Sequence, residues 1–174
     1  MEVIKTTDPA EFERYANECL AGHEGMVIHT CDKPCIWTGQ LRTYNPSATD
    51  LFVGKALYLG GTIVNGKGDV SICRTTWGNS DFAPDLVRRS AEWLKEKDLS
   101  VTTDENDVLV DGKKVISWAR FTTVKGWCQS VVHYSVNVDL ELIRAICTKP
   151  MVKVPGALSD YGITTKEILT LISG

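Results

Sequence analysis

The sequence predicts an α+β fold, in which helices pack on a mixed, largely antiparallel sheet. Three observations support this prediction. A capped, amphipathic segment near the N-terminus has helical spacing, short β-branched segments fill the middle of the chain, and the dipeptide Asp111-Gly112 separates two apolar segments as in a tight hairpin. Strands joined by short turns, with helices around them, are typical of an antiparallel sheet that buries a face under helices.

The chain is expected to open with a helix that begins after Asp8. Asp8 can cap the first turn, Pro9 suits the first helical position, and Gly22 lies beyond the end. The apolar stripe of this helix consists of Phe12, Ala16, Cys19 and Leu20. Apolar, β-branched segments then predict strands at 26–30, 35–38 and 51–59.

The second half is predicted to begin with a strand over VSICRTT and a helix over DFAPDLVRRSAEWLKEKD, with Asp81 or a neighbour as its cap. Its core-facing residues would be Leu86, Val87, Ala91 and Leu94. A hairpin then pairs 106–110 with 114–120, because Asp-Gly suits a type I′ turn whose two central residues need positive φ.

A second turn near Lys125-Gly126 is expected to lead into a strand over CQSVVHYSVNV and a short helix over DLELIRAIC. The last helix begins at Thr164, where Glu167 completes a capping box. The order of elements therefore alternates between strand pairs and single helices.

The composition is that of a soluble globular protein and excludes several classes. The 174 residues are 43% hydrophobic and 24% charged, which excludes a disordered or fibrous chain. Nineteen basic and 22 acidic residues give a net charge of −3, which argues against a broad nucleic-acid or membrane surface. Because the N-terminus is charged and no apolar run approaches about 20 residues, we expect a cytoplasmic protein with a single domain over 1–174.

The cysteines and histidines give no clear sign of a site. Cys31 and Cys35, with His29 nearby, form one cluster, but the spacing is not that of most zinc knuckles and no second ligand pair follows. Core packing is therefore favoured over a metal site. His23, His29 and His133 fall in no motif that demands a general base, so we expect satisfied surface or core histidines.

The segment LGGTIVNGKGD, at 59–69, has the composition of a ligand-binding loop. The adjacent Gly60 and Gly61 would let the backbone approach a ligand closely, and their N–H groups could cradle a phosphate. The spacing matches neither the P-loop nor the dinucleotide fingerprint. A plain glycine hairpin is the alternative interpretation.

The predicted hairpin carries Asn106 and Asp107 on one arm and Lys114 on the other. Pairing about the turn would bring these side chains to one surface. Their oxygens could bind Mg²⁺, and the lysine ammonium suits a phosphate or an acyl-adenylate. An exposed hairpin with solvated charges is the alternative.

Taken in order, these segments resemble the catalytic domain of lipoate-protein ligases, in the biotin/lipoate protein ligase superfamily. RYANECL resembles its opening helix, CIWTGQLR the strand before the substrate pocket, LGGTIVNGKGDVSI its glycine-rich loop, and NDVLVDGKKVISWAR its catalytic-lysine turn. VHYSVNVDLELI and VPGALSDYGIT resemble the later segments of the domain. The collinear set carries the resemblance, because no single motif is decisive.

The resemblance implies a two-step reaction, in which ATP converts lipoate or octanoate to an acyl-adenylate and a lysine of a lipoyl carrier domain then attacks it. On this basis Lys114 matches the catalytic lysine, and Asn106 and Asp107 match the pair that faces Mg²⁺ and phosphate. The matching glycines of the loop are Gly60, Gly61 and Gly68.

The sequence departs from the family in the adenylate loop. Lys55 is the one cation where the family has an arginine pair, and a lysine binds phosphate without the bidentate fork of arginine, so triphosphate binding should be weaker. Trp118 replaces a small residue after the lysine and would fill space that cofactor occupies in the relatives. Together with Trp37, it is predicted to form part of the ligand wall.

Three alternatives to the ligase remain open. An ATP-independent acyltransferase would carry the acyl group on a cysteine, for which Cys147 and Cys128 are candidates outside the family's Pro-Cys-Gly setting. A biotin ligase would need an arginine- and glycine-rich loop that the chain lacks. A non-catalytic binding protein would keep the fold alone. No accessory C-terminal domain is recognised, so an active enzyme is expected to need a partner subunit.

Overall fold

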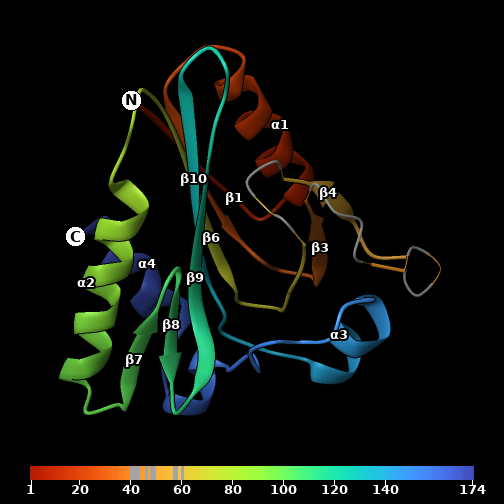
Figure 1. The fold of residues 1–174 in the computed structure, drawn as a ribbon, viewed down its shortest axis with the longest axis vertical. Coiled ribbons are helices and arrows are strands. Elements are labelled where there is room, and N and C mark those ends of the chain that lie inside the picture. The colour runs from red at the N-terminus through yellow and green to blue at the C-terminus, as the bar shows by residue number, and fades with distance from the viewer. Residues whose placement is uncertain (40–43, 46, 48–49, 57–58, 60) are drawn as a thin grey trace.

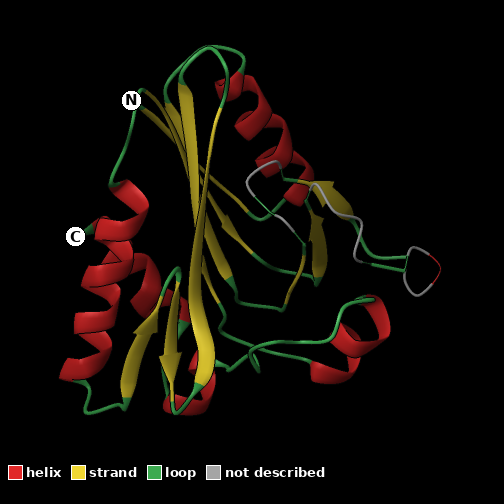
Figure 2. Ribbon diagram, in the orientation of Figure 1, coloured by secondary structure: helices red, strands yellow, loops and turns green. Residues whose placement is uncertain are grey.

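The computed structural model describes residues 1–39, 44–45, 47, 50–56, 59 and 61–174. A large sheet runs through the middle of the molecule, with helices on both of its faces (Figures 1 and 2). Helices α2 (Phe82–Glu96) and α4 (Thr165–Ser173) cover one face. The other face carries α1 (Pro9–Leu20), a small second sheet and α3 (Leu140–Ile146). The α+β prediction is confirmed.

The large sheet is mixed and largely antiparallel in the part of the chain that is described. Its seven strands lie in the order β1-β2-β6-β10-β9-β8-β7, and β1 and β2 are its parallel pair. Their bounds are Glu2–Thr6 (β1), Gly25–Thr30 (β2), Val70–Trp77 (β6), Val101–Asp104 (β7), Asp107–Val110 (β8), Lys113–Thr122 (β9) and Trp127–Tyr134 (β10). Two of these strands were not predicted: β1 precedes the first helix, and β7 lies at the far edge. Both are largely exposed, so neither has the apolar alternation that marks a strand.

The second sheet consists of β3 (Cys35–Thr38), β4 (Val53–Lys55) and β5 (Thr62–Asn65), in the order β4-β3-β5. It corrects two predictions. The strand expected at 51–59 is limited to 53–55 within the described residues. The stretch 62–65, which was assigned to the glycine-rich loop, is a strand, because its backbone pairs with β3.

The N-caps of α1, α2 and α4 lie where the sequence predicted them. The Asp8 side chain accepts from the Ala10 amide at 3.0 Å, and Thr164 and Glu167 form the reciprocal capping box. Asp81 occupies the N-cap of α2, and the hydrogen bond at this end comes from its neighbour, because Ser80 Oγ accepts from the Phe82 amide at 3.2 Å.

The predicted hairpin joins β8 to β9. Asp111 and Gly112 have φ of 51° and 77°, as a type I′ turn requires. The pairing contains a bulge that the sequence did not indicate: Val108 lies opposite Ile116, whereas the next residue, Leu109, lies opposite Lys114, so that Val115 is the extra residue.

Each face of the large sheet has its own buried cluster. The cluster under α2 includes Ile72, Leu86, Ile116 and Val132, and the cluster under α1 includes Phe12 and Trp37. Successive residues of a strand point to opposite faces, so one strand contributes to both clusters. Among the described residues, none of the helices has the length and apolar composition needed to cross a bilayer.

Candidate functional site

Two adjoining cavities lie on the face of the large sheet that α2 does not cover. Cavity A has a volume of about 470 Å³ and cavity B of about 390 Å³. The residues that line both are Gly61, Thr62, Ile63, Asp107, Lys114, Ser117 and His133. These shared residues mark a junction between the cavities, and the lysine singled out from the sequence lies at this junction.

Most of the predicted site residues converge on cavity B. Trp37 from β3, Gly61 before β5, Asn106 and Asp107 at the start of β8, and Lys114 from β9 all line it. Gly60 lies outside the described residues. As far as the described chain defines the cavities, Lys55 and Gly68 border neither of them. Lys55 is exposed on β4, and Gly68 forms the turn before β6, where Thr165 donates a hydrogen bond to its carbonyl at 2.7 Å.

Trp118 also borders cavity B, but its indole has another environment. It packs against the cluster under α2, and the guanidinium of Arg120 lies 5.7 Å from its ring centroid. Strand alternation explains this, because Ser117 and Ala119 on either side face His133 and Val131 across β10, on the cavity side. The packing of the indole therefore gives no support to the prediction that Trp118 fills cofactor space.

The bulge at Val115 directs Lys114 into the site. Ser117 and Lys114 are three residues apart, so in a regular strand their side chains would lie on opposite faces. With one extra residue between them, both line the two cavities, while Ile116 packs into the cluster under α2. Bulges commonly re-aim a side chain beside a functional site in this way.

The backbone of Lys114 is also held from its other side. Its N–H donates to the Val154 carbonyl at 2.9 Å, and its carbonyl accepts from the Gly156 amide at 2.8 Å. A Cβ on Gly156 would lie 2.8 Å from Cβ of Lys113, so only glycine allows this approach. Segment 149–155 therefore passes directly along the edge of cavity A.

Asp107 is engaged by a lysine from that segment. Lys153 Nζ lies 2.6 Å from Asp107 Oδ2 and 2.9 Å from Asp104 Oδ2, and these hydrogen bonds, to Asp107 first, raise the pKa of Lys153 above its ordinary value. The described residues contain no group of three or more His, Cys, Asp or Glu side chains placed to hold a metal ion. Mg²⁺ commonly uses one or two carboxylates plus substrate phosphates, so the Asn106-Asp107 pair fits Mg²⁺ only when a phosphate shares it.

Cavity A is lined by several cations. Lys114, Lys149 and Lys153 all border it, together with Asn137 and the apolar Val138 and Ile143. Lys149 and Lys153 were not identified from the sequence, because they lie far along the chain from the glycine-rich loop. They add positive charge to a site where the sequence had suggested too few cations, because Lys55 alone stands in place of the arginine pair.

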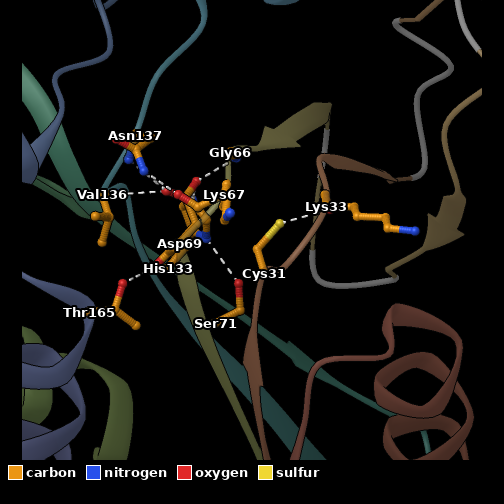
Figure 3. Close-up of polar contacts among 11 residues, drawn as sticks. Cys31, Lys33, Gly66, Lys67, Asp69, Ser71, His133, Val136, Asn137 and Thr165 are labelled. Atoms are coloured by element: carbon orange, nitrogen blue, oxygen red, sulfur yellow. Dashed lines mark hydrogen bonds and ion pairs between the residues drawn. The ribbon is translucent and has the colours of Figure 1, made fainter.

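The shared wall of the cavities contains a hydrogen-bonded triplet that the sequence analysis also missed (Figure 3). The Asp69 carboxylate accepts from the amides of Gly66, Val136 and Asn137 at 2.7–3.1 Å. Its Oδ2 lies 3.4 Å from His133 Nε2, and His133 Nδ1 lies 2.9 Å from Ser71 Oγ. His133 is thus satisfied, as expected of a core histidine, but it also faces both cavities.

The triplet belongs to a polar row that crosses five strands. Register pairs His29 with Ser71, Ser71 with His133, His133 with Ser117, and Ser117 with Asp107. Directly opposed residues share a face, so these five side chains lie in one line beneath the site. A polar residue within an otherwise apolar strand was the sequence signal for this row. The sequence does not show which of these residues lie opposite one another, because that depends on strand register.

The two cysteine candidates differ in position. Cys147 borders cavity A, and burial raises the pKa of its thiol. Cys128 is fully buried and, within the described chain, is not part of either lining. Cys31 and Cys35 are buried in the cluster under α1, where the Cys31 thiol donates to the Lys33 carbonyl at 3.0 Å.

Comparison with known proteins finds similarity in structure alone. No family model matches the sequence, and no curated protein matches it either. Among solved structures, P. falciparum LipL1 in complex with lipoate has a TM-score of 0.78 at 14% identity, over 99% of this chain and 60% of that one. This chain therefore spans about three fifths of the length of that protein.

Two further structures are similar at the same level. The bi-partite lipoate protein ligase from Thermoplasma acidophilum, from a study with its E2 lipoyl domain, has a TM-score of 0.75 at 13% identity, over 99% of this chain and 80% of that one. A lipoate-protein ligase A bound with ATP has a TM-score of 0.75 at 12% identity, over 98% of this chain and 81% of that one. The chain has the catalytic-domain fold of the biotin/lipoate protein ligase superfamily.

Proposed function

We propose that this protein is a lipoate-protein ligase-like enzyme that activates lipoate or octanoate with ATP and transfers the acyl group to a lysine of a carrier domain. The observation that carries the proposal is the position of Lys114 at the junction of two adjoining cavities. An acyl-adenylate has an apolar chain and an anionic nucleotide, joined at the mixed anhydride. A cation at the junction would meet that anhydride.

Cavity B suits the acyl chain. Its lining includes Phe12, Trp37, Leu59, Ile63 and Val131, which offer apolar contact along one part of the cavity. The lipoate-bound structure of P. falciparum LipL1 supports lipoate as the kind of acid to test first.

Cavity A suits the nucleotide. Lys149 and Lys153 border it with Lys114, although Lys153 is already paired with Asp104 and Asp107, so Lys114 and Lys149 are the cations we assign to the phosphates. These two lysines would offset part of the missing arginine pair, because point charges attract phosphate even without bidentate geometry. The ATP-bound lipoate-protein ligase A supports ATP as the nucleotide.

In the first step a carboxylate oxygen of the acid attacks the α-phosphorus of ATP and pyrophosphate leaves. Lys114 would stabilise the negative charge that builds on the α-phosphate oxygens. Asn106 and Asp107 would hold Mg²⁺ together with the phosphates, and the ion would supply neutralisation of phosphate charge when bound. In the second step a carrier lysine amine attacks the acyl carbon, AMP leaves, and Lys114 would again face the charge on the departing phosphate.

The acceptor would be a lipoyl carrier domain. The T. acidophilum ligase, which is bi-partite and was studied with its E2 lipoyl domain, motivates both this acceptor and an accessory subunit as a partner of the present chain. Residues 1–174 would act as the single catalytic domain of such an assembly.

A second candidate is a non-catalytic protein that binds an acid in the ligase fold. It is favoured by the ion pairs of Lys153, because this lysine already neutralises Asp107 and Asp104 and so competes with Mg²⁺ and phosphate for the same groups. An ATP-independent acyltransferase has one observation in its favour, the position of Cys147 at cavity A.

The test is acid-dependent exchange of labelled pyrophosphate into ATP, with lipoate and octanoate, followed by transfer to a lipoyl domain with and without a candidate accessory subunit. Lys114→Met should reduce exchange by on the order of 100-fold, since it removes one electrostatic contact in the transition state. Lys113→Met, at an exposed neighbouring lysine, is the matched control and should retain wild-type exchange. Equal activity of the two variants would rule out the role of Lys114, and acyl transfer without ATP would favour the transferase.

A further inference from the structure

The Asp69-His133-Ser71 triplet contains the three groups of a proton relay. Ser71 Oγ lies 2.9 Å from His133 Nδ1, and His133 Nε2 lies 3.4 Å from Asp69 Oδ2 (Figure 3). A hydroxyl, an imidazole and a carboxylate in this arrangement match the triad of serine hydrolases, which is recognised by the geometry and roles of its members and not by their order in the sequence. None of the steps of the proposed ligase reaction uses this triplet.

The hydrogen bonds of Asp69 determine which nitrogen of His133 carries the proton. The amides of Gly66, Val136 and Asn137 all donate to the Asp69 carboxylate, which is an acceptor only. Nε2 of His133 faces the same carboxylate, so we assign the proton of the neutral ring to Nε2. Nδ1 is then an acceptor, and the Ser71 hydroxyl must be its donor.

A serine held in this way is prepared to attack a carbonyl carbon. As the donor, Ser71 Oγ keeps both of its lone pairs, and its proton already points to a base that can take it. Asp69 is a positioning residue, because it holds the ring in the tautomer that can accept this proton and would stabilise the imidazolium that forms.

The triplet faces the space that we assign to the acyl chain. Ser71 lines cavity B together with apolar side chains, and His133 lines both cavities. Ser71 is 5% exposed and His133 is 7% exposed, so both residues keep some accessible surface. Lys114 lines the same cavity, and its ammonium can stabilise the oxyanion of a tetrahedral intermediate.

We propose that Ser71 and His133, positioned by Asp69, form a catalytic centre that hydrolyses acyl thioesters without ATP. A thioester is favoured over an amide as the substrate class, because a thiolate is a better leaving group than the nitrogen of an amide. The inference takes only one element from the proposed function, the acyl chain in cavity B. Its product is a free acid, which is the compound that the ligase reaction would consume.

The reaction has two half-reactions. In the first, Ser71 Oγ attacks the thioester carbon and His133 Nδ1 takes the hydroxyl proton. The C–S bond breaks, the proton passes from His133 to the departing sulfur, and the acyl group remains as an ester on Ser71. In the second, water attacks the ester carbon and gives a proton to Nδ1. The C–O bond to Ser71 breaks, the proton returns to Oγ, and the carboxylic acid leaves.

The first test maps the nucleophile on the wild-type protein. The full chain is treated with an alkyl fluorophosphonate, which bonds to an activated serine with loss of fluoride, and the modified peptide is identified by mass spectrometry. We expect modification at Ser71. Ser71→Ala should not be labelled, whereas Ser100→Ala, the matched control at an exposed serine, should be labelled like the wild-type protein.

The second test measures release of octanoate from octanoyl-N-acetylcysteamine, a minimal thioester, in the absence of ATP. Ser71→Ala should abolish release above the uncatalysed rate, and His133→Gln should lower it by on the order of 100-fold. Asp69→Asn should lower kcat and leave KM nearly unchanged. The asparagine amide can donate to Nε2, which places the ring proton on Nδ1, while cavity B stays as it is.

A thermal melt separates these results from a folding defect, and Ser71→Ala should melt within about 4 °C of the wild-type protein. A larger drop leaves the mapped label on the wild-type protein as the deciding result. Wild-type hydrolysis by a folded Ser71→Ala variant, or acylation of Cys147 in place of Ser71, would overturn the inference.

The remaining outcomes distinguish the inference from the proposed function. Pyrophosphate exchange without labelling or hydrolysis would overturn the thioesterase centre and leave the ligase standing. Labelling of Ser71 and hydrolysis without any exchange would support the centre and remove the ligase. Absence of labelling, hydrolysis and exchange would overturn both.

Discussion

The two faces of the large sheet are built from the same strands, but one face packs under α2 and the other lines the cavities. On the face toward α2, Ile72, Val132 and Ile116 lie on adjacent strands and are at most 1% exposed. On the opposite face, their sequence neighbours Ser71, His133 and Ser117 line the cavities. At these three positions, alternation along the strand places a packing residue beside a site residue.

The faces also differ in how they treat buried polar atoms. On the packed face, Ser90 Oγ donates to the Leu86 carbonyl at 2.8 Å and lies 2.8 Å from the Tyr134 hydroxyl, whose pKa burial raises to about 12. On the cavity side, buried atoms of Asn65, Trp37 and His29 have no partner within the described chain. Arg74 Nε and Thr76 Oγ1, on the α2 side of β6, are also buried without a partner among the described residues, so the difference is that Asn65 and Trp37 border a cavity.

The largest effect should come from opening a void on the packed face. Ile72→Ala removes a side chain that is 0% exposed and should cost about 2–5 kcal/mol of unfolding free energy, from lost burial and the cavity left behind. Ser71→Ala, one residue away, should cost about 1 kcal/mol or less, because it removes one hydrogen bond beside an existing cavity. Denaturant unfolding measures both, and equal costs would break the comparison.

The next effect concerns Asp69, whose carboxylate is strongly hydrogen-bonded on the cavity face. Asp69→Ala leaves the amides of Gly66, Val136 and Asn137 without their acceptor and should cost about 3 kcal/mol. Asp69→Asn keeps one oxygen and should cost less. The same unfolding curves check this, and a loss below about 1 kcal/mol for alanine would show that water replaces the carboxylate.

The elements that sequence reasoning identified are those set by local chemistry. The turn at Asp111-Gly112, the cap at Asp8 and the box at Thr164 each depend on residues within a few positions, so the pattern contains them. The order of motifs along the chain then pointed to the correct fold.

What the sequence did not reveal depends on register between distant segments. The bulge at Val115 exists only as a mismatch between two paired strands, yet it decides which way Lys114 points. Ser71 and His133 are 62 positions apart, and Lys153 and Asp107 are 46 apart. No local sequence pattern shows that these residues are in contact, so neither the lysines of cavity A nor the Asp69-His133-Ser71 triplet was predicted.

The pH dependence of stability offers a third way to compare the faces. Burial lowers the pKa of His29, which packs 5.7 Å from the ring of Phe12 and 6.4 Å from that of Trp37. An unfolded histidine binds its proton near pH 6.5, so the unfolded state binds more protons as the pH falls. Stability from the neutral His29 is therefore present above about pH 6.5 and lost below it, by at most about 1.4 kcal/mol per pH unit.

The His29→Phe variant should flatten that slope while keeping the ring cluster. Unfolding curves between pH 5 and pH 8 would show wild type losing stability toward acid faster than the variant. If both slopes are the same, His29 takes up its proton without cost and the burial argument fails.

The smallest expected effect compares two serines, one for each face. Ser90→Ala leaves the buried Tyr134 hydroxyl without its partner and should cost about 1–2 kcal/mol, because that hydroxyl cannot reach water. Ser117→Ala should change stability by no more than about 0.5 kcal/mol, since Ser117 borders open cavities where solvent can take the place of its hydroxyl. Thermal melts of the two variants at one pH give the comparison directly. An equal cost at Ser117 and Ser90 would mean that the hydroxyl of Ser117 is as firmly hydrogen-bonded as that of Ser90. The polar groups of the cavity face would then be satisfied without a ligand.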